Sequence, residues 1–343
     1  MKKGLLLLLS ALLLLGCVPS TAPESEGIVF TDSLGREVRL PERIERIAAS
    51  GVISQMVLFA IAPDLLVGLS ETWDETAASY LPEEYYNLPE LGQIYGGKGN
   101  FDPEALLNSG AQVVIDIGEP KDGAKEELDA LSKQLGLPIV HLDATLTTTD
   151  EVYRVLGTLL NREAEGEALA KRCERMDEIL ATLAAIPEKP RVLYCMGDKG
   201  LNVLAKGSYH AELLDTVTDN AAVVDVPSSK GTGNEVDMEQ ILLWDPDFIV
   251  FAADSIGTTV GDDPLWSELN AVKNSSYDIV PYGPYNWFGT PPSVQRYLGM
   301  LWLGATLYPD AIDYDLKTEV KEYFLAFYHC ELTDEALNDL LGA

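Results

Sequence analysis

The chain has 343 residues, of which 47% are hydrophobic, and it carries a formal net charge of −31. A surface this acidic repels nucleic acid and anionic lipid, so we expect neither as a direct partner. The length is large for one hydrophobic core and suits two lobes.

The N-terminal segment predicts export. Lys2 and Lys3 precede about a dozen apolar residues, fewer than the roughly 20 that cross a bilayer, and this order is typical of a signal peptide. The apolar run ends in Leu-Leu-Gly-Cys, which resembles a bacterial lipoprotein box and implies that Cys17 is lipidated. We therefore assign residues 1–17 to a lipoprotein signal peptide. Residues 18–27 are rich in Pro, Ser, Thr and Glu and predict a flexible tether. The protein is expected outside the cytoplasm, held at the membrane by its lipid.

Residues 28–161 alternate strand and helix patterns and predict an N-terminal α/β lobe. Apolar strands are expected at 46–50, 65–69, 113–118 and 138–143, and helices near 52–61 and 124–135.

Two segments of the chain align without a gap, which indicates an internal duplication. They are FDPEALLNSGAQVVID at 101–116 and VDMEQILLWDPDFIVF at 236–251. Each copy predicts a helix capped by an Asp (Asp102 and Asp237) and then a continuously apolar strand. Such strands are typical of parallel sheets buried on both faces.

A long helix is expected between the two copies, at 162–187. Leu169, Cys173, Met176, Leu180 and Leu183 fall on one of its faces, and Asn161 stands where an N-cap would. About 24 helical residues span roughly 36 Å, enough to bridge two lobes. The remaining residues, 188–343, predict a C-terminal α/β lobe that ends in three helices. The predicted fold class is thus α/β, with two Rossmann-like lobes of parallel sheet joined by a single long interdomain helix.

Signatures of catalysis are missing. The sequence has no G-x-S-x-G and no H-E-x-x-H, its three histidines are scattered, and its cysteines show no C-x-x-C spacing. His141 lies in an apolar strand and is interpreted as a core residue. We expect no enzyme, no cofactor and no direct metal site.

Aromatic and basic residues near predicted strand ends suggest a small-molecule site, because open α/β sheets bind ligands there. The candidate ligand-binding residues are Trp73, Tyr95, Lys98, Tyr209, Tyr285, Trp287 and Arg296.

A resemblance to a known family is carried by FTDSLGREVRLPERIERIAA, the two duplicated units, DPLWSELNAVKNSSYDIVP and LGMLWLGATLYPD. The chain resembles the substrate-binding proteins for iron chelates, haem and cobalamin, the class III periplasmic binding proteins. The resemblance runs from about residue 30 to residue 310. It implies a monomer that clamps a ligand between two lobes and delivers it to an ABC permease with its ATPase subunits. It also implies that Glu104 and Glu239 dock on the permease.

Several ligands stay open under this resemblance. A ferric siderophore or a corrinoid ranks first. If the ligand is haem, Tyr95 is a possible ligand to its iron. The tract PYNWFGTPPSVQR also looks like relatives that take molybdate or tungstate, in which helix starts, here near Ser50-Gly51 and Ser293, could hold the anion. Two other classes, a chelatase-like enzyme and an adhesive surface protein, are weaker alternatives.

Overall fold

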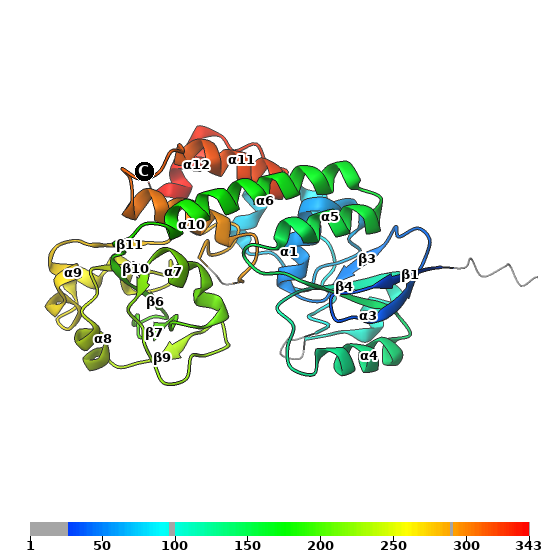
Figure 1. Ribbon diagram of the computed structural model, residues 1–343, viewed down its shortest axis with the longest axis horizontal. Helices are drawn as coiled ribbons and strands as arrows, with labels where there is room; N and C mark the ends of the chain where they lie inside the picture. Colours follow the sequence, from blue (N-terminus) through cyan, green and yellow to red (C-terminus); the bar gives the residue numbers. More distant parts are fainter. Residues whose placement is uncertain (1–26, 96–99, 289–290, 343) are drawn as a thin grey trace, which may run out of the picture.

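The computed structural model describes residues 27–95, 100–288 and 291–342. Two α/β lobes lie side by side below a long helix, α6 (Figure 1). The expected signal peptide, the lipidation site Cys17, nearly all of the tether, and Lys98 lie outside the described residues. In the part that is described, no helix has the length and apolar character to cross a membrane.

The N-terminal lobe is built on a three-stranded parallel sheet in the order β3 (Ile47–Ala49), β4 (Val113–Gly118), β5 (Ile139–Asp143). All six residues of β4 are buried, as the continuous apolar pattern predicts. A separate antiparallel hairpin, β1 (Ile28–Thr31) and β2 (Glu37–Leu40), precedes the sheet. The helices of this lobe are α1 (Val52–Ile61), α2 (Glu83–Tyr86), α3 (Pro103–Asn108), α4 (Ala124–Leu135) and α5 (Thr149–Leu160).

The prediction of a strand at 65–69 is wrong. This segment forms only two isolated bridges, Ile47 with Leu66 and Leu69 with Glu90. The Leu69 amide donates to the carbonyl of Pro89 at 2.8 Å, so part of the hydrogen bonding goes to a loop and leaves no regular ladder.

The connecting helix α6 spans Glu163–Ala184, within the range expected for it. Its predicted apolar face is buried against neighbouring elements. It packs closely on α5, where the Cα of Gly157 lies only 2.9 Å from the point at which a Cβ on Gly166 would stand. Asn161 does not cap α6 as predicted. It ends α5 in the left-handed conformation, with φ 55°, and Arg162 is the N-cap of α6.

The C-terminal lobe has a mixed sheet in the order β11-β10-β6-β7-β9, with β8 also paired to β6. The central strands β6 (Arg191–Met196), β10 (Phe248–Phe251) and β11 (Tyr277–Ile279) are parallel. The short strands β7 (Asn202–Val203) and β9 (Asn234–Glu235) run antiparallel to their neighbours, and β8 (Asp219–Asn220) is parallel to β6. Its helices are α7 (Glu212–Val217), α8 (Met238–Trp244) and α9 (Asn270–Lys273). The two duplicated units fold alike, as α3 followed by β4 and as α8 followed by β10.

Three C-terminal helices complete the molecule: α10 (Arg296–Leu307), α11 (Leu316–Tyr328) and α12 (Asp334–Leu341). In Figure 1, α11 and α12 lie beside α6. Helix α11 packs on α1 of the N-terminal lobe as well as on α6, and Arg172 of α6 pairs with Glu319 of α11 at 2.6 Å. One core cluster extends from Leu58 through Leu183 to Tyr194. The lobes are therefore joined by shared packing in addition to the single connecting helix.

Candidate ligand-binding site between the lobes

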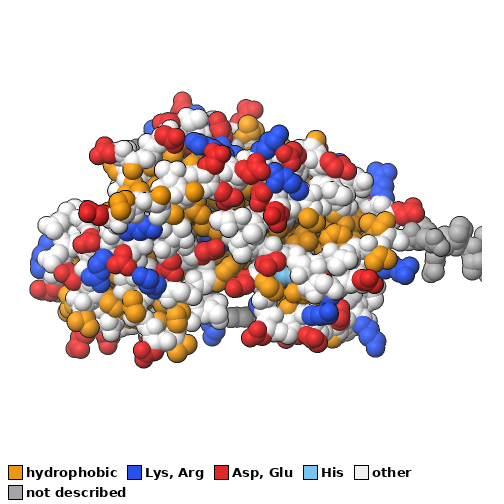
Figure 2. All heavy atoms as spheres, in the orientation of Figure 1, with side chains coloured by type: hydrophobic (Ala, Val, Ile, Leu, Met, Phe, Trp, Pro, Cys, Tyr) orange, Lys and Arg blue, Asp and Glu red, His pale blue; other side chains and the backbone are white. Residues whose placement is uncertain are grey.

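The boundary between the lobes forms where loops that follow the strands meet. Figure 2 shows the surface indented between the lobes on the side remote from α6. On the N-terminal side, Ser50 follows β3 and Ala144 follows β5. The C-terminal side supplies Tyr209 and the segments 282–288 and 291–296.

Hydrogen bonds cross this boundary directly. The Tyr209 hydroxyl donates to the carbonyl oxygen of Ala144 at 3.2 Å, and the Tyr282 hydroxyl donates to Oδ2 of Asp74 at 3.2 Å. Burial, together with the negative charge of Asp74 and the hydrogen bond to it, raises the pKa of Tyr282 to about 12. The phenol therefore remains a donor at neutral pH and holds the two lobes together.

Trp73 and Tyr285, both predicted ligand-binding residues, meet across the boundary. Their ring centroids are 5.8 Å apart. The indole N–H of Trp73 donates to the carbonyl of Tyr85 at 3.3 Å, so its polar atom is already bonded within its own lobe. The hydroxyl of Tyr285, in contrast, is buried and has no hydrogen-bond partner among the described residues. Burial raises the pKa of Tyr285, which keeps the hydroxyl protonated.

Arg296 and Tyr209, a second pair from the predicted set, also come together. The guanidinium carbon of Arg296 lies 5.2 Å from the centroid of the Tyr209 ring, a cation–π arrangement. Arg296 is only 2% exposed, and its Nη1 donates to a carboxylate oxygen of Glu212. Its Nε is buried without a partner among the described residues. An unpaired buried donor costs about 1–3 kcal/mol, so a bound acceptor at this position is favourable.

Two helix starts approach each other at the same boundary. Helix α1 begins after Gly51 and α10 begins after Gln295, and neither start has a side-chain cap. The first amides of α10 are already bonded to backbone carbonyls, that of Arg296 to Ser293 at 3.0 Å. Neither first turn contains an acidic residue. The hydroxyl of Ser293 lies 3.0 Å from the sulfur of Met56 in α1, which brings the two segments together. Helix N-termini favour anions.

Tyr95 lies beside the start of α1, where its amide donates to the carbonyl of Ser50 at 3.2 Å. Its hydroxyl donates to Oε2 of Glu127 at 3.1 Å, and the Lys121 ammonium is 5.1 Å from its ring centroid. Burial and the contact with Glu127 raise the pKa of Tyr95 to about 12. Iron coordination requires the phenolate, so this environment disfavours Tyr95 as a haem ligand.

The prediction that Trp287 binds the ligand is not supported by its position. It is fully buried, and its indole N–H donates to the carbonyl of Gly283 at 2.9 Å. The side chain packs in the core beneath the loop and offers no surface to a ligand. This burial could not be predicted from the sequence, because an aromatic residue in a loop can point inward or outward.

His141, expected to be a satisfied core residue, is buried at 1% exposure, but its Nε2 has no hydrogen-bond partner among the described residues. Its Nδ1 lies 2.7 Å from Oδ2 of Asp116, and the other oxygen of Asp116 accepts from the hydroxyl of Ser50. The carbonyl of Ser50 accepts from the amide of Tyr95. This buried chain ties the sheet to the loop that begins α1.

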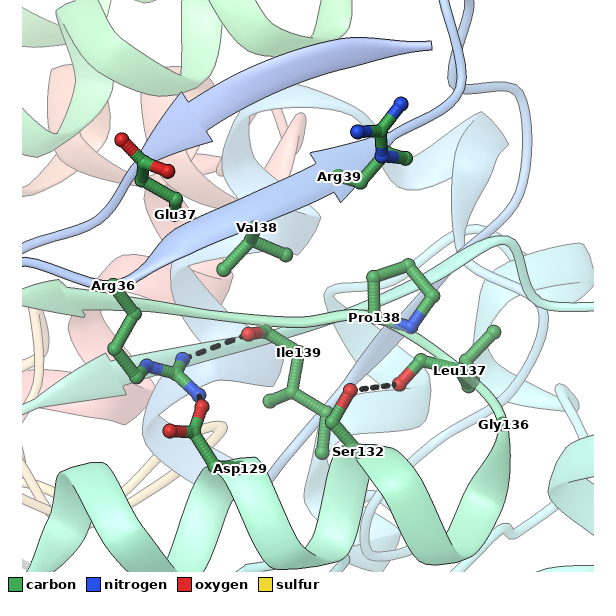
Figure 3. A pocket seen from close by; sticks show the side chains of 10 residues that line it. All are labelled: Arg36, Glu37, Val38, Arg39, Asp129, Ser132, Gly136, Leu137, Pro138 and Ile139. Carbon is green, nitrogen blue, oxygen red and sulfur yellow. Dashed lines mark hydrogen bonds and ion pairs between the residues drawn. The ribbon is translucent and has the colours of Figure 1, made fainter.

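A cavity of about 320 Å³ lies elsewhere, on the outer surface of the N-terminal lobe between β2 and the segment before β5 (Figure 3). Two arginines line it: Arg36 is paired with Asp32 and Asp129 and donates to the carbonyl of Ile139, whereas Arg39 is exposed.

Metal-binding groups of three or more His, Cys, Asp or Glu side chains are not found within residues 27–95, 100–288 and 291–342. Cys173 and Cys195 are buried free thiols, while Cys330, also free, is partly exposed.

Glu104 and Glu239 are exposed in the first turns of α3 and α8. Asp102 accepts from the amide of Ala105 at 2.9 Å, and Asp237 accepts from that of Gln240 at 2.8 Å, so both caps form as predicted. Both helices lie on the side of the molecule remote from α6 (Figure 1).

Sequence reasoning missed three residues of the boundary. Tyr282 stands in the same loop as Tyr285, and Asp74 directly follows Trp73, so both neighbourhoods were visible in the sequence. Glu212 is 84 positions from Arg296, and nothing in a single sequence joins them.

The model of the periplasmic binding protein family matches residues 103–276, about half of the chain. The chain belongs to the periplasmic binding protein family. This confirms the resemblance found in the sequence, and the family consists of solute-binding proteins and not of enzymes. No curated protein matches the chain.

Several solved structures share the whole fold of this periplasmic binding protein. An ABC transporter solute-binding protein from Sulfurospirillum deleyianum is 29% identical, with a TM-score of 0.82 over 92% of this chain and 99% of that one. A periplasmic solute-binding protein from Veillonella parvula is 28% identical, with a TM-score of 0.74 over 91% and 96%. The molybdate-binding protein MolA of Haemophilus influenzae is 20% identical, with a TM-score of 0.68 over 89% and 99%, a likeness of fold alone.

Proposed function

We propose that this chain is the substrate-binding lipoprotein of an ABC importer, anchored through Cys17 outside the cytoplasm, and that it captures an anionic, metal-containing solute between its lobes. The observation that carries the proposal is the pair of buried, unpartnered donors at the boundary, Tyr285 Oη and Arg296 Nε. Both belong to residues predicted to bind a ligand. Donors of this kind are satisfied by an anion that enters from solvent.

Within this class the geometry favours a compact oxyanion such as molybdate or tungstate. Hydrogen bonds of 3.2 Å already join the lobes at Tyr209 and at Tyr282. Packing of α11 on both α1 and α6 opposes wide separation of the lobes. The start of α1, which has no side-chain cap and no acidic residue in its first turn, adds an anion-favouring dipole from the N-terminal lobe.

A ferric siderophore or a corrinoid, ranked first from the sequence, is the second candidate. The observation in its favour is the aromatic contact between Trp73 and Tyr285, since flat rings in the lobe boundary can pack on a large chelate. Binding such a ligand requires both cross-lobe hydrogen bonds to break. Haem is a weaker fit, because Tyr95 is bonded to Glu127 and is held in its protonated form.

Delivery is assigned to Glu104 and Glu239. They stand at equivalent positions of the duplicated units, one on each lobe, and both are exposed. Two carboxylates so placed can pair with basic residues of a permease. In this role the chain acts as a monomer.

Thermal unfolding of the soluble body, from residue 18 onward, tests the ligand class. The panel contains molybdate, tungstate, sulfate, ferric siderophores, cyanocobalamin and haem. A ligand at 100 times its dissociation constant stabilises the protein by about 2.7 kcal/mol. We expect stabilisation by molybdate or tungstate. Stabilisation by a chelate alone would select the second candidate, and no response to any member would contradict the proposal.

A further inference from the structure

The two docking helices share a second feature besides their glutamates. In the ungapped alignment of the duplicated units, Glu104 corresponds to Glu239 and Leu107 corresponds to Leu242. Leu107 is 54% exposed and Leu242 is 38% exposed. In each helix the leucine follows the glutamate by three positions, so both lie on one helical face.

Both helices also have a buried face, so the exposure of these leucines does not mean that the helices are unpacked. The residues directly before them, Leu106 and Ile241, occupy equivalent positions and are both fully buried. Each helix therefore buries one apolar residue and presents another to solvent beside its exposed acid. In α8 the following residue, Leu243, is exposed as well, at 78%. Figure 2 shows hydrophobic atoms among acidic ones along the edge of the C-terminal lobe where α8 lies.

A single exposed leucine is ordinary on a protein surface. The same acid-and-leucine pair recurs at matched positions of the two lobes, and neither leucine belongs to a core cluster of the described residues. In protein interfaces a buried apolar core contributes affinity, while charges at its rim contribute orientation and association rate.

We propose that Leu107 and Leu242 are apolar anchors of the permease interface, each inserting into a pocket that adjoins the basic residue paired with its glutamate. The inference rests on the proposed function. It specifies the partner's chemistry: two sites on the outer face of the permease, one for each lobe, and each made of a basic side chain next to an apolar socket. Leu243 enlarges the contact on the C-terminal lobe.

The test uses the full-length protein and its permease–ATPase complex in lipid nanodiscs, with dissociation constants measured over a series of salt concentrations. The variants are Leu107→Ser with Leu242→Ser, and Glu104→Gln with Glu239→Gln. The matched control is Leu325→Ser, since Leu325 is 53% exposed but lies on α11, on the opposite side of the molecule. Circular dichroism melts confirm that every variant is folded.

We expect the double leucine variant to weaken docking at least tenfold and Leu325→Ser to leave it within twofold. The leucine variants should keep the salt dependence of the wild type, whereas the glutamine variants should flatten it. If the glutamine variants weaken docking and the leucine variants match Leu325→Ser, the anchor inference is overturned and the proposed function stands. If neither set weakens docking, the role of the glutamates fails as well.

Discussion

The ring of Tyr209 covers the guanidinium of Arg296 at 5.2 Å, while its hydroxyl reaches the other lobe at Ala144. One side chain thus shields the buried positive charge and bonds the two lobes. Under the proposed function, opening of this contact would expose Arg296 and so couple lobe movement to anion binding.

Arg296→Gln should weaken anion binding by about 10- to 100-fold, because it removes a charge-assisted hydrogen bond worth roughly 1.5–3 kcal/mol. Glu212→Gln is the opposing variant: it removes the carboxylate that competes for the same guanidinium, and it should leave affinity unchanged or raise it. Isothermal titration with tungstate measures both. Equal losses in the two variants would point to a structural ion pair without a role in binding.

Tyr209→Phe combined with Tyr282→Phe should open the ligand-free protein. Each substitution removes one cross-lobe hydrogen bond, worth about 0.5–1.5 kcal/mol, and together they shift the ratio of closed to open forms by roughly 30-fold. Distances between spin labels on α3 and α8 report the change. Tyr314→Phe is the control, because it loses a 2.7 Å bond to Leu301 that does not cross the lobes. Unchanged distances in the double variant would show that these bonds do not hold the lobes.

Asp177 of α6 makes stability depend on pH. Burial, followed by the charges of Asp150 and Glu174, raises its pKa from 3.8 to about 6. The folded protein therefore keeps the proton at a pH where the unfolded chain releases it, and this contribution to stability is present below pH 4 and lost as the pH rises to about 6.

The free energy of unfolding of Asp177→Asn should equal that of the wild type below pH 4 and exceed it above pH 6. The side chain is only half buried, so we expect a gain of about 1 kcal/mol in the free energy of unfolding, less than the roughly 3 kcal/mol of a two-unit shift. Urea melts at pH 4 and pH 7.5 measure it, with the exposed Glu178→Gln as control. A gain of equal size at both pH values would contradict this account.

Gly166→Ala should destabilise the protein by about 1–3 kcal/mol, because a Cβ there would stand 2.5 Å from the carbonyl oxygen of Tyr153. The matched substitution is Gly261→Ala, where the nearest atom, the Tyr277 hydroxyl, is 3.8 Å away. Thermal melts should show a lower midpoint for the first variant only. A neutral Gly166→Ala would mean that α5 and α6 can separate without cost.

The elements that the sequence predicted best are those with a strong local signal. Helices at 52–61 and 124–135 and the caps at Asp102 and Asp237 form as expected, because periodicity and capping depend on nearby residues. The segment 65–69 has an apolar pattern too, but part of its hydrogen bonding goes to a loop. Tertiary packing, which the local sequence does not reveal, determines this pairing.

Side-chain direction in loops could not be predicted. Trp287 turns into the core and Tyr285, two positions earlier, turns to the lobe boundary, although both read as loop aromatics. Contacts between residues far apart in the sequence could not be predicted either. The partnership of Arg296 with Glu212 exists only after two separate helices pack, and that packing is a property of the whole fold.

Anomalous scattering from crystals of the protein with bound tungstate tests the central claim most directly. The account predicts one tungsten site per chain, between the lobes, with its oxygens about 3 Å from Arg296 Nε or Tyr285 Oη. Tungsten found only on the outer surface, or no ordered tungsten at saturating tungstate, would contradict it.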